Sequence, residues 1–82
     1  MTLELKCFLR VVKVKSKTSA YVRDLQLSEG DVIEISMPLK YSHYANYITL
    51  VNQRNGFVKK NCSANQFMSV LPTTLDVSVL EP

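Results

Sequence analysis

The sequence predicts an all-β protein, a small barrel of five to six strands with one short helical turn near residues 63–71. Apolar residues alternate with polar ones in several segments, which is the period of strands with one buried face. The pair Asn55-Gly56 stands between two β-prone segments and is the strongest short-range signal for a β-hairpin. The 82 residues are enough for one domain, so residues 1–82 are interpreted as a single β-barrel domain.

The first predicted strand is long and bent. Its odd positions are apolar and are expected to face the core: Leu3, Leu5, Cys7, Leu9 and Val11. After Val11 the alternation shifts by one residue, because Val12 and Val14 are the next aliphatic residues. A shift of this kind indicates a β-bulge or a sharp bend.

The second strand follows a polar segment and a turn. Residues 15–20 are expected to form a loop, and "DLQLSEGD" (24–31) ends in a turn in which Gly30 supplies a conformation that other residues resist. The strand then runs from Val32 to Leu39 with its odd positions inward and Pro38 near its end.

A hairpin is predicted for the third and fourth strands. After the loop "KYSHYAN" (40–46), residues 47–51 are β-rich, and a two-residue type I′ turn at Asn55-Gly56 leads to a strand over residues 57–60. In this register Arg54 faces Phe57 and Asn52 faces Lys59, while Lys59 and Lys60 point to opposite faces.

The helical turn is predicted from a capping pattern. Ser63 precedes Gln66 by three residues, and Pro72 is expected to end the helix. Phe67 and either Val70 or Leu71 would face the core. The alternation at Leu75, Val77 and Val79 predicts a last strand, which would lie beside the first strand and close the sheet.

Two segments resemble SH3 domains, over about residues 25–71. "LQLSEGDVIEI" (25–35) resembles their diverging turn, and "NGFVKKNCSANQFMSVL" (55–71) resembles their distal hairpin, fourth strand, short 3₁₀ turn and last strand. The resemblance implies an SH3-like barrel. It does not imply binding of proline-rich peptides, because the chain has no Trp and its first strand lacks the Tyr-rich motif of SH3 ligand grooves.

In size and style the chain also resembles the small proteins of lytic bacteriophages that bind host machinery. This likeness implies an accessory or host-takeover role in the bacterial cytoplasm. The cytoplasm is also expected from the sequence, which has no signal-peptide pattern, no apolar run long enough to cross a membrane and only two cysteines.

Charge is distributed in blocks. The net charge is +5 over residues 1–23, −3 over 24–53, +3 over 54–60 and −2 over the tail, which gives +3 for the chain. Such blocks predict a body with a basic pole and an acidic pole.

No arrangement of residues predicts catalysis, a cofactor or a metal site. His43 is the only histidine, and Cys7 and Cys62 are isolated from each other in the sequence. One histidine and two cysteines are too few for a tetrahedral zinc site, and no Gly-rich phosphate loop is present. Cys7 is expected to act as a small hydrophobe on the apolar face of its strand. We therefore expect a protein that is not an enzyme.

Two sets of residues are candidates for binding. Tyr41, His43 and Tyr44, together with Arg54, could form a surface for a partner protein, since Tyr offers a large area and a polar tip. The second set could bind RNA or single-stranded DNA if the first strand continues far enough to align its lysines. It comprises Lys13, Lys15, Lys17, Arg54 and Lys59.

These observations favour a non-catalytic binding module, a phage-type protein that binds and modulates or inhibits a host protein. Oriented charge suits docking to a protein more than binding to a uniformly anionic polymer. A β-barrel that binds nucleic acid is the alternative, and a structural subunit whose last strand pairs across chains is a third possibility. The protein is expected to be a monomer or a small homo-oligomer that does not enter membranes.

Overall fold

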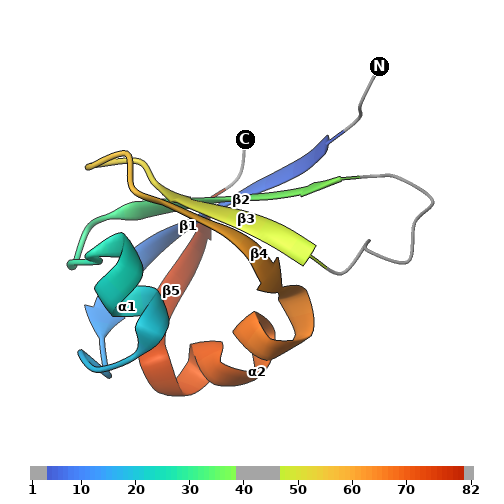
Figure 1. Cartoon of the computed structure of the whole chain (residues 1–82). Helices are drawn as coiled ribbons and strands as arrows, with labels where there is room; N and C mark the ends of the chain where they lie inside the picture. The colour runs from blue at the N-terminus through green and yellow to red at the C-terminus, as the bar shows by residue number, and fades with distance from the viewer. Residues whose placement is uncertain (1–3, 39–46, 81–82) are drawn as a thin grey trace.

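The computed structural model describes residues 4–38 and 47–80 and contains five strands and two helices. In chain order they are β1 (Glu4–Val14), α1 (Ala20–Leu25), β2 (Val32–Pro38), β3 (Tyr47–Asn52), β4 (Val58–Ser63), α2 (Ala64–Thr74) and β5 (Leu75–Leu80). The strands form one antiparallel sheet with the order β4-β3-β2-β1-β5 (Figure 1). The prediction of a mostly β fold is confirmed, but the sheet is not closed into a barrel, since β4 and β5 remain its edges.

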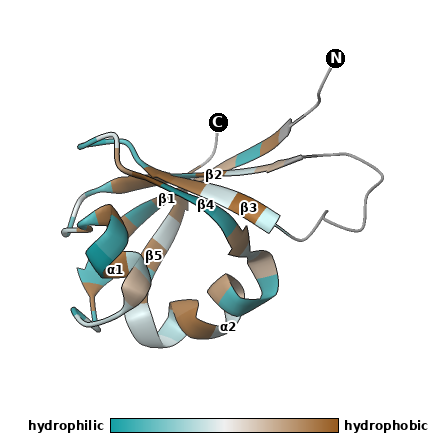
Figure 2. Ribbon diagram, viewed as in Figure 1, coloured by the Kyte–Doolittle hydropathy of each residue, from teal (hydrophilic) through white to brown (hydrophobic). Residues whose placement is uncertain are grey.

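Both helices lie on the same side of the sheet and cover the core (Figure 1). Figure 2 shows hydrophobic segments on both helices and on the strands above them. Phe67 of α2 is 2% exposed and meets Tyr21 of α1 edge to face, with 5.2 Å between ring centroids. The most deeply buried hydrophobic residues come from both helices and four of the strands: Val11, Leu25, Ile33, Leu50, Phe67 and Leu75.

The expected bulge in β1 is present. The pairing of β1 with β5 shifts between Val11 and Lys13, and Val11 is 1% exposed. Of the odd positions of β1 that were predicted to face the core, Leu9 and Val11 are buried. Leu5 is 52% exposed and Cys7 is also exposed, because the first half of β1 extends beyond the helices (Figure 1). The expectation that Cys7 is a packed hydrophobe is therefore wrong.

Helix α1 was not predicted. It occupies part of the segment that was expected to be loop and turn, and it buries Tyr21, Val22 and Leu25. The spacing of these three residues is that of one helical face, but six residues are too few for a clear helical period in the sequence. The helix ends at Gln26, which has a left-handed φ of 48°.

The β3–β4 hairpin is confirmed, whereas its predicted turn is wrong. Val51 pairs with Val58, and the Asn52 N–H donates to the Phe57 carbonyl at 2.9 Å. The loop therefore contains residues 53–56, and Asn52 does not pair with Lys59. Gly56 has a φ of 77°, while Asn55 does not adopt the positive φ that a type I′ turn requires.

The capping prediction for α2 is confirmed, because the Ser63 hydroxyl accepts a hydrogen bond from the Gln66 N–H at 3.3 Å. The helix continues past Pro72, so the expectation that this proline ends it is wrong. Its last turn is held from outside, since the Thr74 carbonyl accepts hydrogen bonds from the N–H groups of Lys15 and Ser16. No residue separates β4 from α2 or α2 from β5, and β5 lies beside β1 as predicted.

Candidate binding surfaces

A buried polar network joins the β3–β4 loop to the end of α1. Arg54 Nε donates to Asp31 Oδ1 at 2.6 Å, and Asn52 Nδ2 donates to Asp31 Oδ2 at 3.0 Å. Asn52 Nδ2 also donates to the Leu25 carbonyl at 3.0 Å, and Arg54 Nη2 donates to the Gln26 carbonyl at 3.0 Å. Asp31 and Asn52 are 4% and 0% exposed. The network holds the loop against α1, so the guanidinium of Arg54, a predicted binding residue, is already engaged within the fold.

The network also sets the charge state of Asp31. Burial acts to raise the pKa of this carboxyl, but hydrogen bonds from Arg54, Asn52 and the Ser28 N–H outweigh burial and lower the pKa below its ordinary value. The same contact with Asp31 raises the pKa of Arg54. Both groups are therefore charged at neutral pH.

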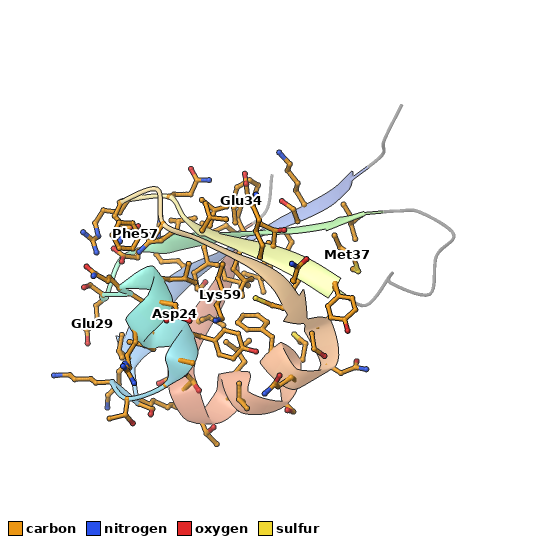
Figure 3. All side chains as sticks on the ribbon, viewed as in Figure 1. Asp24, Glu29, Glu34, Met37, Phe57 and Lys59 are labelled. Atoms are coloured by element: carbon orange, nitrogen blue, oxygen red, sulfur yellow. The ribbon has the colours of Figure 1, made fainter. Side chains whose placement is uncertain are left out.

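A second cluster connects β4 with α1. Lys59 forms an ion pair with Asp24, and its ammonium group lies 5.7 Å from the centre of the Tyr21 ring (Figure 3). The hydrogen bond to Asp24 raises the pKa of Lys59. Burial raises the pKa of the neighbouring Cys62 thiol, so this cysteine is protonated at neutral pH and is a poor nucleophile.

Ion pairs neutralise the segment that was expected to be an acidic pole. Asp24 pairs with Lys59, and Asp31 pairs with Arg54. Glu34 pairs with Lys6, and in the C-terminal strand Asp76 pairs with Lys15 at 2.9 Å. Among the side chains that the structure describes, Glu29 is the one acid without such a partner. Five described cations form no ion pair: Arg10, Lys13, Lys17, Arg23 and Lys60. The described surface therefore has a basic surplus rather than two opposite poles.

The candidate residues are not brought together as the sequence suggested. β1 ends at Val14, so Lys15 and Lys17 lie beyond the strand that would have aligned them with Lys13. Lys15 donates to the Pro72 carbonyl at 2.8 Å in addition to its ion pair. Lys15, Arg54 and Lys59 are thus engaged internally, whereas Lys13 and Lys17 have no ion pair in the described ranges. The remaining candidates, Tyr41, His43 and Tyr44, lie outside the described residues.

The sheet face without helices carries an apolar row that crosses all five strands. Directly paired residues of antiparallel strands project from the same face. Glu34, in the middle of the row, lies on the side of the sheet away from the helices (Figure 3). We call these paired residues the outer row: Leu80, Phe8, Glu34, Val51 and Val58.

Basic side chains border the outer row. Lys6 and Arg10 lie two positions before and after Phe8 on β1, and Lys60 lies two positions after Val58 on β4. Strand residues two positions apart share a face, so these three cations lie on the face of the outer row. We call the row and these cations together the outer face. The sequence alone did not indicate it, because it depends on the registers of four strand pairs.

A groove of about 660 Å³ opens on the other side of the molecule, at α1. It is formed by the end of β1, the helix and the turn that follows the helix. The lining residues are Val14, Lys17, Val22, Arg23, Gln26, Leu27, Ser28 and Glu29. Sequence reasoning missed this groove because it requires α1.

Within residues 4–38 and 47–80, no group of three or more His, Cys, Asp or Glu side chains could hold a metal ion. The helices in these ranges are also too short or too polar to span a membrane. Comparisons with protein-family models, curated proteins and solved structures gave no match. No match therefore supports the SH3 resemblance. The resemblance implied a short 3₁₀ turn and a last strand before residue 71, whereas residues 64–71 lie within α2 and the last strand is β5.

Proposed function

We propose that the protein is a non-catalytic module that binds another protein through its outer face, in the manner of a small phage protein that modulates a host protein. The observation that supports this function is the outer row. Antiparallel sheets with one covered face are normally polar on the other face. Here four of the five paired residues are apolar, and Val58 is 48% exposed.

The composition of the outer face resembles that of a protein interface. An apolar centre surrounded by a polar rim is the usual anatomy of such surfaces. Glu34 is the one charged member of the row, with a side chain 20% exposed, and Lys6 lies 4.0 Å from its carboxylate. Its charge is therefore partly balanced from the same face. Val58 is exposed, while the other apolar members of the row are half-buried.

Charge indicates the kind of protein that would fit. Arg10 and Lys60 border the row and have no ion pair among the described side chains. Complementary charge accelerates association and orients the partners. A partner with an apolar patch surrounded by acidic residues therefore suits the outer face.

Affinity capture from a bacterial lysate tests the proposal. The Val58→Glu variant places a charge in the outer row, and we expect it to lose a stoichiometric partner that the unmodified protein retains. Val79→Glu is the matched control, because Val79 is 70% exposed on an edge strand but pairs with core-facing Leu9. Equal loss by both variants, or capture of no stoichiometric protein by the unmodified chain, would contradict the proposal.

Nucleic-acid binding is the second candidate, and the five cations without ion pairs favour it. Tyr47, on the outer side of β3, is 46% exposed and could stack on a base. Binding of labelled single-stranded oligonucleotides should weaken with salt, and the salt slope should fall by about one in Lys13→Ala. Lys59→Ala should leave that slope unchanged, since Lys59 is paired with Asp24. Absence of binding at low salt would remove this candidate.

A further inference from the structure

We propose that the groove at α1 is a second binding site, one that accepts a peptide segment with an aliphatic side chain flanked by carboxylates. This site is separate from the outer face and does not depend on the function proposed for that face. Its floor is apolar, since Val22 and Leu27 are each 6% exposed and Val14 is half-buried beside them. A floor of this kind suits a leucine-sized side chain.

The walls of the groove are fixed by hydrogen bonds within the fold. After the left-handed residue Gln26, the Leu27 N–H donates to the Val22 carbonyl at 3.1 Å, which returns Leu27 to the helix. Asp31 binds the Ser28 N–H at 2.8 Å, and the Gly30 N–H donates to the Val11 carbonyl at 2.7 Å. The turn is therefore anchored both to β1 and to the buried polar network. A preformed site avoids part of the entropy that ordering would cost on binding.

The charge of the rim indicates the ligand class. Lys17 and Arg23 line the groove, and neither forms an ion pair with a described side chain. Glu29 is the one acid in the lining, so cations exceed acids two to one. Gln26 and Ser28 add an amide and a hydroxyl that can bind a peptide backbone. A carboxylate-bearing peptide is thus favoured over a basic one.

The shape of the groove favours a peptide over a small molecule. Its volume lies within the range of about 300–1,000 Å³ that is usual for ligand sites, but it is open to solvent. Small ligands are usually bound in sites that bury most of their surface. A segment that crosses the groove needs to bury only one side chain on the floor, while its flanking carboxylates reach the cations of the rim.

Nuclear magnetic resonance titration with a defined peptide tests the site. The first probe is an acetylated, amidated octapeptide with two leucines, each flanked by glutamates, and the second probe has glutamine in place of every glutamate. We expect the acidic peptide to shift the amide signals of the lining residues and the glutamine peptide to bind at least about fivefold more weakly. Shifts confined to other parts of the protein, or equal binding of both peptides, would overturn the proposal.

Charge variants distinguish binding in the groove from general electrostatic attraction between the acidic peptide and the basic protein. The double variant Lys17→Glu/Arg23→Glu should weaken binding of the acidic peptide by about tenfold, whereas Glu29→Gln should tighten it by about two- to fivefold. The control Arg10→Glu/Lys60→Glu makes the same charge change on the outer face and should leave the affinity nearly unchanged. Equal weakening by both double variants would overturn the proposal that the peptide binds in the groove. Because the control alters the outer face alone, failure of the peptide test leaves the capture experiment with Val58→Glu unaffected.

Discussion

The buried polar residues Asp31 and Asn52 determine the conformation of the β3–β4 loop through their hydrogen bonds. Asn52 is fully buried, and its amide serves both the Leu25 carbonyl and the Asp31 carboxylate, while its oxygen accepts the Arg54 N–H at 3.0 Å. A buried polar group without its partners costs free energy, so these contacts explain the four-residue loop that replaces the expected tight turn. Sequence patterns do not reveal such partners, because Asn52 and Leu25 are far apart in the chain.

Replacing Asn52 should destabilise the fold. Asn52→Ala removes a buried donor to Asp31 and the acceptor of the Arg54 N–H, while the Leu25 carbonyl keeps a donor from Asn55. We expect the free energy of unfolding to fall by about 1–3 kcal/mol. Denaturant unfolding measures the change. Asn65→Ala, at an exposed position of α2, is the control and should change the value by less than about 0.5 kcal/mol. A similar effect for both variants would contradict the role of the network.

Stability should also depend on pH through Asp31. Its pKa is lower in the folded protein than the unfolded value of 3.8, so the unfolded chain takes up the proton first as the pH falls. The stabilisation is complete above the unfolded pKa and is lost as the pH falls through the folded pKa. Denaturant unfolding between pH 7 and pH 2 should show a smaller acid loss in Asp31→Asn than in the unmodified protein. Parallel curves for the two proteins would argue against this contribution.

The two cysteines should differ in reactivity. Cys7 is exposed, whereas Cys62 is 6% exposed and burial raises its pKa. A thiol-specific chromogenic reagent should therefore label one thiol rapidly in the native protein and the second only on unfolding. Cys7→Ser should remove the rapid phase, and a rapid phase that persists in this variant would show that Cys62 is accessible.

At the scale of elements, sequence patterns predicted the structural features that depend on residues close together in the chain. Alternation predicted the strands, the phase shift after Val11 predicted the bulge, and Ser63 with Gln66 predicted the start of α2. Helix α1 was missed because its burial pattern spans only one turn and a half. The prediction from Pro72 was wrong because the helix is also held from outside, by hydrogen bonds from the N–H groups of Lys15 and Ser16 to the Thr74 carbonyl. Local sequence does not show these contacts.

The cap of α2 should contribute measurably to stability. Ser63→Ala removes the acceptor for the Gln66 N–H, and we expect a loss of about 1 kcal/mol in the free energy of unfolding. Ser69→Ala is the matched control, since Ser69 is exposed within the helix and Ala favours helix. Thermal unfolding of the two variants should therefore give a lower midpoint only for Ser63→Ala, and equal midpoints would contradict the cap.

At the scale of the whole molecule, folding brings charges from different blocks of the sequence together in ion pairs. Three of the four acids at residues 24–34 pair with cations that are distant in sequence, as Asp24 does with Lys59 and Asp31 with Arg54. Block charges could be read from the sequence, but these pairings could not, because they depend on how α1 and the hairpin pack. The outer face likewise depends on four strand registers, which the sequence patterns did not reveal.

The open sheet should appear in amide hydrogen exchange. β1, β2 and β3 each have a neighbouring strand on both sides, whereas β4 and β5 each have one neighbour. We expect the amides of the three interior strands to be the slowest to exchange and those of the two edge strands to exchange faster through local opening. Uniform protection of all five strands would indicate a closed barrel instead.

The absence of loops between β4, α2 and β5 limits how the sequence of this protein can evolve. One residue inserted in α2 would rotate everything after it by about 100° around the helix axis. A one-residue slip in β5 would exchange its two faces, placing Asp76 and Ser78 toward the core. Because no loop in residues 58–80 can absorb such a change, this part of the chain should vary by substitution and keep its length.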